Sequence, residues 1–305
     1  MKKVCTLIGC IILFVSIDFI GSAILKKGLD RYFGLNQNSS VLLLGHSHLM
    51  LATDKERLEK ELGCLVSKYC REGVDVTSRY MMLQHYLSLP DKDSLKCVFY
   101  GVDQYMFNPT GLSDNVYKLF YPFMDESVIS DYIHGQTDVK DYWHHKLIRL
   151  SRYNDALINS SLRGWMSDWS NYKLGVVDMD KVRQNMNSSH QLRPIVFDAD
   201  LCAVFEATLD TLVNRNIDVV LINTPIIKEY NEADPASYHK VIEYFQQLEK
   251  SSEKIHYWDF NIEFSDHYDL FFDPIHLNRK GQEVITNRII NAARYGNFGC
   301  YPVVQ

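Results

Sequence analysis

Two short stretches at opposite ends of the chain carry residues that could do nucleophilic chemistry. Near the start, an apolar run leads into Gly45-His46-Ser47-His48, and near the end Asp273 and His276 stand three residues apart. A serine hydroxyl becomes a good nucleophile when an imidazole accepts its proton, and a carboxylate can hold that imidazole in the required tautomer. The residue types therefore offer a nucleophile in Ser47, a general base in His276 and an orienting carboxylate in Asp273.

Each piece also has a simpler structural interpretation. Gly-x-Ser is a common sequence, and here it could mark an ordinary corner between a strand and a helix. His276 could be a loop histidine that caps the last helix. Taken one at a time, these structural interpretations are favoured, so the chemical hypothesis depends on the fold bringing the two stretches together.

The elements around Ser47 are those expected at the edge of a parallel sheet. The run Val41 to Leu44 has no polar break, which is typical of a strand buried on both faces. Gly45 permits a sharp turn, and an amphipathic helix is predicted from Leu49 to Leu62, closed by Gly63. Ser47 would then lie at the carboxyl edge of the sheet, where open α/β folds bind their ligands.

Strands and helices alternate along most of the remaining chain. Buried strands are predicted at 65–69, 95–100, 217–222 and 255–260, and helices at 78–89, 199–214, 238–250 and 282–293. This order implies right-handed crossovers and a central, mostly parallel sheet between two layers of helices. The predicted fold class is therefore three-layer α/β/α, with two additions described next.

The additions are an N-terminal anchor and a helical insertion. Residues 4–25 form an apolar run, with Asp18 as its only charge, that is long enough to cross a membrane as one helix. We therefore predict an anchor at 1–31 and an α/β domain at 32–305. Residues 108–195 break the alternating rhythm and are rich in aromatic residues, so we predict a mostly helical insertion, which could be a lid over the sheet edge or an aromatic satellite core.

Composition narrows the classes of partner. The chain has 305 residues and a net charge of −6, and its basic residues are scattered, which gives no sign of a nucleic-acid surface. Seven cysteines without a CxxC pair argue against a zinc site. A metal-dependent hydrolase is a weaker third hypothesis, because its candidate ligands fit no recognised spacing: His46, His48, His267, Asp269, Asp273 and His276. No metal or other cofactor is expected.

Taken together, the two stretches resemble the SGNH, or GDSL-like, superfamily of esterases and acyltransferases. The likeness consists of a strand followed by Gly45-x-Ser47 and a helix, Asp273-x-x-His276 near the end, and glycine turns at Gly73 and Gly101. It covers residues 41–107 and 196–293. The resemblance implies a flavodoxin-like sheet, catalysis by Ser47, His276 and Asp273, and an oxyanion hole that includes the backbone N–H groups of Ser47 and Gly73.

Two positions depart from the pattern of that superfamily. The usual Gly-Asp-Ser is Gly45-His46-Ser47, and the usual Gly-x-Asn-Asp is Gly101-Val102-Asp103-Gln104. An ionised Asp103 cannot donate a hydrogen bond to an oxyanion as asparagine does. Either Gln104 donates instead, or Asp103 is protonated, or the hole has two donors only.

A looser likeness suggests a subgroup and a function. The anchor, the early serine and the helical middle are similar to the D-alanyl transfer protein of lipoteichoic acid synthesis and to anchored proteins of bacterial polysaccharide O-acetylation. These imply a single-pass, extracytoplasmic serine esterase or O-acyltransferase that acts on an acylated cell-envelope glycan or acyl donor, beside a multi-span membrane acyltransferase. The alternative is a catalytically degenerate scaffold or glycan-binding subunit with the same fold.

Overall fold

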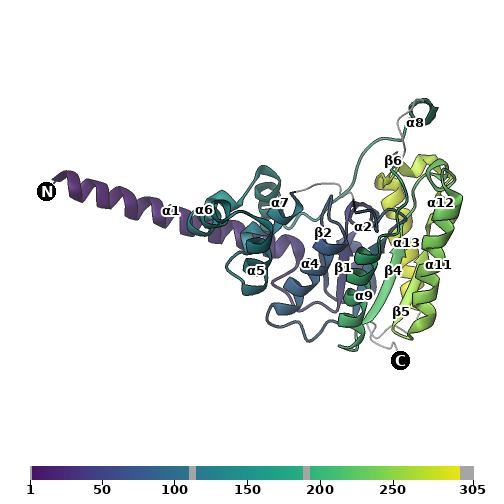
Figure 1. Ribbon diagram of the computed structural model, residues 1–305, viewed down its shortest axis with the longest axis horizontal. Coiled ribbons are helices and arrows are strands. Elements are labelled where there is room, and N and C mark those ends of the chain that lie inside the picture. Colours follow the sequence, from purple (N-terminus) through teal and green to yellow (C-terminus); the bar gives the residue numbers. More distant parts are fainter. Residues whose placement is uncertain (1, 110–114, 188–192, 296–305) are drawn as a thin grey trace. The chain divides into compact units, whose positions relative to one another are not determined.

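The structure is a computed structural model that describes residues 2–109, 115–187 and 193–295 (Figure 1). The chain groups into two compact units. Unit 1 consists of Met1–Asn36 with Asn115–Asp168, and unit 2 consists of Gln37–Asp114 with Trp169–Gln305. The predicted domain boundaries, 1–31 and 32–305 with an insertion at 108–195, stay predictions.

Unit 2 is built on a five-stranded sheet whose neighbouring strands are all parallel. The order across the sheet is β2-β1-β3-β4-β5, so the predicted parallel α/β fold is confirmed. The first four strands are buried along their whole length, as expected for strands covered on both faces. The strands are β1 (Val41–Gly45), β2 (Val66–Cys70), β3 (Cys97–Val102), β4 (Asp218–Asn223) and β5 (Ile255–Asp259).

Helices cover both faces of this sheet. On one face, Leu43 and Phe99 belong to a core cluster that includes Ile285 and Ile289 of the last helix. On the other face, Tyr100 packs its ring 5.3 Å from that of Phe205. The first face carries α2 (Ser47–Ala52), α3 (Lys55–Leu62) and α13 (Arg279–Tyr295), and the second carries α4 (Val76–Ser88), α9 (Ala199–Val213) and α11 (Pro235–Ser251).

Shorter elements of unit 2 complete the edge where the strands end. They include a two-stranded antiparallel hairpin, separate from the main sheet. They are α8 (Met179–Asn187), α10 (Lys228–Asn231), α12 (Asn261–Phe264), η3 (Tyr268–Leu270), β6 (Phe271–Asp273) and β7 (His276–Leu277).

The single helix expected after Ser47 is in fact two. α2 ends at Ala52, and α3 begins only at Lys55. Asp54 accounts for the break, because its carboxylate accepts the N–H of Arg57 and so caps a new helix. Hydrophobic periodicity alone passes over such an internal N-cap, since the same face stays apolar on both sides of it.

Unit 1 is helical and is organised along the N-terminal helix. α7 lies against α1 so closely that a Cβ atom on Gly164 would come within 1.9 Å of the carbonyl oxygen of Gly28. Only glycine permits that approach. The elements are α1 (Lys2–Phe33), η1 (Val116–Phe123), α5 (Ser127–Gln136), α6 (Val139–Leu147), η2 (Arg149–Arg152) and α7 (Asp155–Met166).

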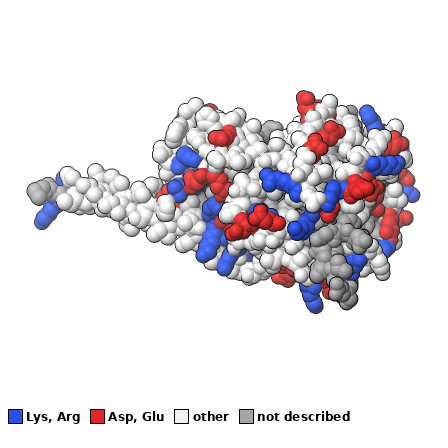
Figure 2. All heavy atoms as spheres, turned by 90° about the horizontal axis from the view of Figure 1, so that it is seen from below, with Lys and Arg blue, Asp and Glu red and all other residues white. Residues whose placement is uncertain are grey.

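The N-terminal half of α1 extends away from the rest of unit 1. Residues 4–17 are all exposed, and most of them are large and apolar. Figure 2 shows this part as an almost uninterrupted white surface with blue lysine at its tip. The helix as a whole is long and apolar enough to cross a membrane.

Candidate active site

The site lies where the direction of the sheet's connections reverses. β1 pairs with β2 on one side and with β3 on the other, so chain segments leaving β1 and β3 diverge to opposite faces. In sheets of this order, that reversal opens a crevice outside the carboxyl ends of the two strands, and ligands bind there. His46 and Ser47 follow β1, and Asp103 follows β3.

The structure brings Ser47, His276 and Asp273 together. Nε2 of His276 lies 2.8 Å from Oγ of Ser47, and Nδ1 of the same ring lies 2.8 Å from Oδ2 of Asp273. Ser47 and His276 are 229 residues apart in the sequence. Both distances fit hydrogen bonds, so a proton can pass between the hydroxyl and the imidazole while the carboxylate holds the other ring nitrogen.

The β6–β7 hairpin fixes His276 opposite Ser47. Asp273 and His276 face each other across the hairpin. Besides holding the imidazole, Asp273 accepts the backbone N–H groups of Ile275 and His276 through Oδ1, at 3.0 and 2.9 Å. One carboxylate thus shapes the turn and orients the ring.

Charge determines the tautomer of His276. Although burial opposes ionisation of Asp273, its hydrogen bonds to the His276 ring and to the turn hold its pKa below the ordinary value. Asp273 is therefore an acceptor, and Nδ1 of His276 carries the proton. That leaves Nε2 free to accept from the Ser47 hydroxyl, as a general base must.

The predicted oxyanion donors divide into two groups. Ser47 begins α2, so its N–H is not used within that helix, and Gly73 lines the same cavity with φ +78°, a backbone conformation that favours glycine. Gln104 is buried, and its Nε2 donates towards the carbonyl oxygen of Tyr230 at 3.5 Å. Among the described residues it is not part of the cavity lining, so its amide is directed elsewhere.

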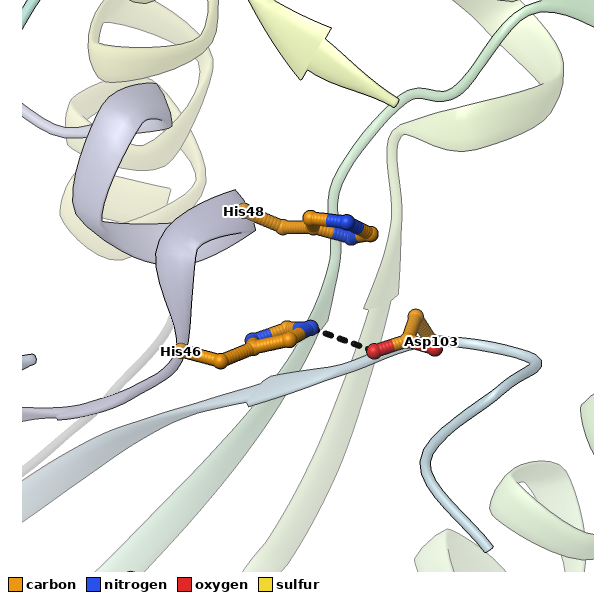
Figure 3. Close-up of side chains that lie close together, drawn as sticks. All are labelled: His46, His48 and Asp103. Atoms are coloured by element: carbon orange, nitrogen blue, oxygen red, sulfur yellow. Dashed lines mark hydrogen bonds and ion pairs between the residues drawn. The ribbon is translucent and has the colours of Figure 1, made fainter. Parts of the chain in front are cut away.

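His46 and Asp103 form a buried pair beside the serine (Figure 3). Nε2 of His46 donates to Oδ2 of Asp103, and Oδ1 of Asp103 accepts the N–H of Tyr105 at 2.6 Å. Burial would raise the pKa of Asp103, but the neighbouring His46 lowers it well below the ordinary value. The lowered pKa favours an ionised Asp103 over the protonated donor considered from the sequence.

His48 lies between this pair and the ring of His276. Its ring centroid is 4.4 Å from that of His46 and 5.3 Å from that of His276. Burial lowers the pKa of both His46 and His48, most strongly that of His48. Both imidazoles are consequently neutral at pH 7, so the cavity floor combines neutral rings with one carboxylate.

The same three side chains are those that could hold a cation. One ligand atom each from His46, His48 and Asp103 lies within 4.8 Å of the others. Imidazoles that bind a metal usually donate their second N–H to an acceptor. Here Nδ1 of both histidines has no hydrogen-bond partner among the described residues. A neutral His46 that is protonated at Nε2 can instead donate its hydrogen bond to Asp103 without any metal. The contacts favour the hydrogen-bonded pair.

Arg79 is a site residue that the sequence analysis missed. Its guanidinium lines the cavity although the residue is only 1% exposed. Nη1 donates to the carbonyl oxygen of Gly101 at 2.6 Å, and Nε donates to that of Asp75 at 3.2 Å. Arg79 thus ties the loop that carries Gly73 to the end of β3. An arginine on an amphipathic helix gives no sequence signal of such burial.

A cavity of about 430 Å³ opens above Ser47. Tyr105, Tyr230 and Phe272 supply aromatic walls, and Lys173 and Arg193 supply positive charge. Both cations come from the last part of the predicted 108–195 insertion. Aromatic faces with polar edges and a few cations are suited to polar, ring-shaped ligands such as sugars.

Comparisons with known proteins give only distant likenesses. No protein-family model matches the chain. No curated protein matches its sequence. Among solved structures, the chain is similar to the C-terminal catalytic domain of peptidoglycan O-acetyltransferase A from Streptococcus pneumoniae, with a methylsulfonyl adduct, at 13% identity over 84% of this chain and 92% of that one, with a TM-score of 0.38. It is also similar to the lipase Lip_vut3 from a goat rumen metagenome, at 13% identity over 85% of this chain and 98% of that one, with a TM-score of 0.35.

Proposed function

We propose that this protein is a membrane-anchored serine acyl esterase or O-acyltransferase that acts on a cell-envelope glycan. Ser47 is the nucleophile, His276 the general base and acid, and Asp273 the carboxylate that orients it. The observation that supports this assignment is the pair of 2.8 Å contacts that join the three side chains. The resemblance of the two sequence stretches to the SGNH superfamily points to the same roles.

The reaction has two steps. Oγ of Ser47 attacks the carbonyl carbon of an acyl ester as Nε2 of His276 takes the hydroxyl proton. The proton then passes to the departing alkoxide, which leaves as an alcohol, and the acyl group stays on Ser47. In the second step, His276 takes a proton from water or a sugar hydroxyl as that oxygen attacks the acyl carbon. His276 then returns the proton to Oγ of Ser47 as the acyl–Ser47 bond breaks, which releases a carboxylic acid or a new ester.

The N–H groups of Ser47 and Gly73 are the donors we assign to the oxyanion. Both belong to residues of the cavity wall. Gln104, predicted as a third donor, is engaged with Tyr230. Since the loss of one such donor typically costs about 10²–10³ in rate, a hole with two donors would make a slow enzyme or one that requires an activated acyl donor.

The cavity and the anchor support the proposed substrate class. Tyr105 and Tyr230 keep their phenolic protons because burial raises the pKa of both, to about 12 for Tyr105. Such rings can stack on a sugar and bind its hydroxyl groups. With α1 in the membrane and unit 2 outside the cytoplasm, the acceptor is an envelope glycan, and a multi-span membrane acyltransferase is the partner that would supply acyl groups.

Activity-based labelling of Ser47 tests the proposal. The full chain in detergent is treated with a fluorophosphonate and digested, and the adduct is located by mass spectrometry, with p-nitrophenyl acetate hydrolysis measured in parallel. We expect an adduct on Ser47 and loss of both signals in Ser47→Ala. Ser88→Ala, a serine substitution at the end of α4, is the matched control. Folded protein that neither labels nor hydrolyses the ester would refute the catalytic assignment.

One observation favours the scaffold alternative. The carboxylate of Asp103 lines the same cavity as Ser47 and Gly73, so it would disfavour negative charge that develops there. A glycan-binding subunit would keep the fold and the cavity without needing that charge to be favourable. Complementation of a gene deletion separates the two functions, since a scaffold works equally well with Ser47→Ala and an enzyme does not.

A further inference from the structure

The helix α1 joins the body of unit 1 before it is long enough to cross a bilayer. A membrane's hydrocarbon core is about 30 Å thick and needs about 20 helical residues. The freely exposed part of α1, residues 4–17, provides about 14 residues, or roughly 21 Å. The next residue, Asp18, is buried in unit 1. If α1 crosses the membrane, part of unit 1 must therefore lie at the boundary between the hydrocarbon core and the headgroups.

The polar groups beside this part of α1 are hydrogen-bonded within the protein, as groups near the hydrocarbon core must be. Both carboxylate oxygens of Asp18 accept backbone N–H groups, from Arg149 and Leu150, each at 2.8 Å. The hydroxyl of Tyr153 donates to the carbonyl oxygen of Ser22 at 2.9 Å. Polar groups near hydrocarbon must find partners within the protein, and these do.

α6 presents an apolar stripe close to the same level. Val139, Trp143 and Leu147 follow one another at intervals of four residues, so they share one side of the helix. They are 67%, 51% and 73% exposed. In unit 1, α6 is the helix that lies nearest the free end of α1 (Figure 1). Its opposite side is held in place by polar contacts, such as the hydroxyl of Tyr121 on Asp141 at 2.6 Å.

We propose that α6 lies in the membrane interface, with Val139, Trp143 and Leu147 inserted among the headgroups and the first acyl carbons of a lipid bilayer. The inference rests on α1 crossing the membrane, which is part of the proposed function. Lipid is the occupant because α6 lies nearest the free end of α1 (Figure 1), and α1 is still apolar and exposed past Asp18, at Phe19 and Ile20, which are both more than half exposed. Tryptophan at this depth is typical of membrane interfaces.

Quenching of Trp143 by brominated lipid tests the proposal. The full chain is reconstituted into vesicles of phosphatidylcholine brominated near the headgroup end of one acyl chain, and its emission is compared with that in unbrominated vesicles. We expect Trp143→Phe to lose most of the quenching. Trp258→Phe, on β5 of unit 2, is the matched control and should retain it.

Substitutions on the stripe provide a second measurement. Val139→Ser with Leu147→Ser should shift Trp143 emission to longer wavelength in vesicles and leave the circular dichroism unchanged. Leu162→Ser with Met166→Ser, at exposed apolar positions of α7, should not shift it. Quenching that is unchanged in Trp143→Phe would overturn the inference. A specific crosslink from position 147 to another membrane protein would also overturn it, because the stripe would then be covered by protein and not by lipid.

The failure of the anchor is distinguishable from the failure of this inference. Protein that alkaline carbonate washes from membranes would refute the membrane crossing of α1, and the inference with it. Protein that stays in the membrane while Trp143 remains unquenched would refute the placement of α6 alone. Neither outcome bears on fluorophosphonate labelling of Ser47, which tests the chemistry separately.

Discussion

His46 at the end of β1 and Asp103 at the end of β3 hold each other by a buried hydrogen bond across the reversal point of the sheet. The SGNH pattern that the two stretches resemble has an acid in its first block, Gly-Asp-Ser, and asparagine in its third, whereas this chain has His46 in the first and Asp103 in the third. The two departures are therefore linked, since each residue satisfies the other. A carboxylate in the third block is stable here because an imidazole stands in the first.

Replacing Asp103 by asparagine should increase esterase activity. Asp103→Asn removes a negative charge from the wall of the cavity that contains Ser47 and keeps the shape of the side chain. We expect a rise of about tenfold in kcat, below the full effect of an added donor, because His46 and Tyr105 already engage both oxygens of this side chain. Hydrolysis of p-nitrophenyl acetate measures the change, and Asp103→Ala is the control for loss of the pair. A slower Asp103→Asn enzyme would mean that the charge of Asp103 takes part in the reaction.

Replacing Asp273 by asparagine should reduce activity with little loss of stability. The amide oxygen can still accept the N–H groups of Ile275 and His276, but the amide cannot hold the same tautomer of the His276 ring. We expect kcat to fall by about 10⁴-fold, as for the corresponding change in the triad of serine proteases. Asp266→Asn, at a neighbouring exposed acid, is the matched control. Equal rates in the two variants would refute the orienting role of Asp273.

Shortening Arg79 should destabilise unit 2. Arg79→Gln removes the guanidinium donor from the carbonyl oxygen of Gly101, whereas that of Asp75 keeps the backbone N–H of residue 79, and an unsatisfied buried group costs about 1–3 kcal/mol. We expect the free energy of unfolding to fall by about 1–3 kcal/mol in urea titrations. Arg79→Lys, which keeps the charge, should lie between wild type and Arg79→Gln. Wild-type stability in Arg79→Gln would show that water or neighbouring groups replace the guanidinium at no cost.

The buried histidines should make the protein sensitive to mild acid. In the folded protein the pKa of His48 lies well below that of an exposed histidine, so below about pH 6.5 the unfolded chain binds a proton that the folded chain does not. Stability then falls as pH falls, by up to about 1.4 kcal/mol per pH unit for each such group. In His48→Phe the free energy of unfolding should fall less steeply as the pH falls than in the wild type. His267→Phe, at an exposed position, should keep the wild-type slope. Identical slopes in all three proteins would contradict a neutral, buried His48.

The parallel sheet was predictable because its strands carry a strong local signal. The apolar runs at Val41, Val98 and Val219 have the hydrophobic pattern of buried strands, and each lies in the sheet. The order Ser47 first and Asp273-x-x-His276 last then identified which residues meet. The break at Asp54 was missed because a cap depends on one hydrogen bond and leaves the hydrophobic pattern unchanged.

The inner part of the site was not predictable because it depends on contacts between distant residues. The pairing of His46 with Asp103 requires β1 and β3 to be neighbours in a given register, which no local pattern specifies. The burial of Arg79 depends on carbonyl groups at Asp75 and Gly101 turning towards it. Likewise, Gln104 is chemically able to donate to an oxyanion, and only the path of the chain after β3 turns it towards Tyr230.

Removing metal should leave the protein folded and its activity unchanged. His46, His48 and Asp103 come close enough to hold a cation. However, His46 and Asp103 already share a hydrogen bond. A metal-bound imidazole usually donates its second N–H to an acceptor, and among the described residues Nδ1 of both histidines has none. We expect less than one equivalent of zinc by elemental analysis, and equal melting temperature and esterase activity before and after dialysis against a chelator. His48→Asn should likewise contain less than one equivalent of zinc. Stoichiometric zinc that disappears in His48→Asn would reverse this interpretation and make the histidine pair a metal centre next to Ser47.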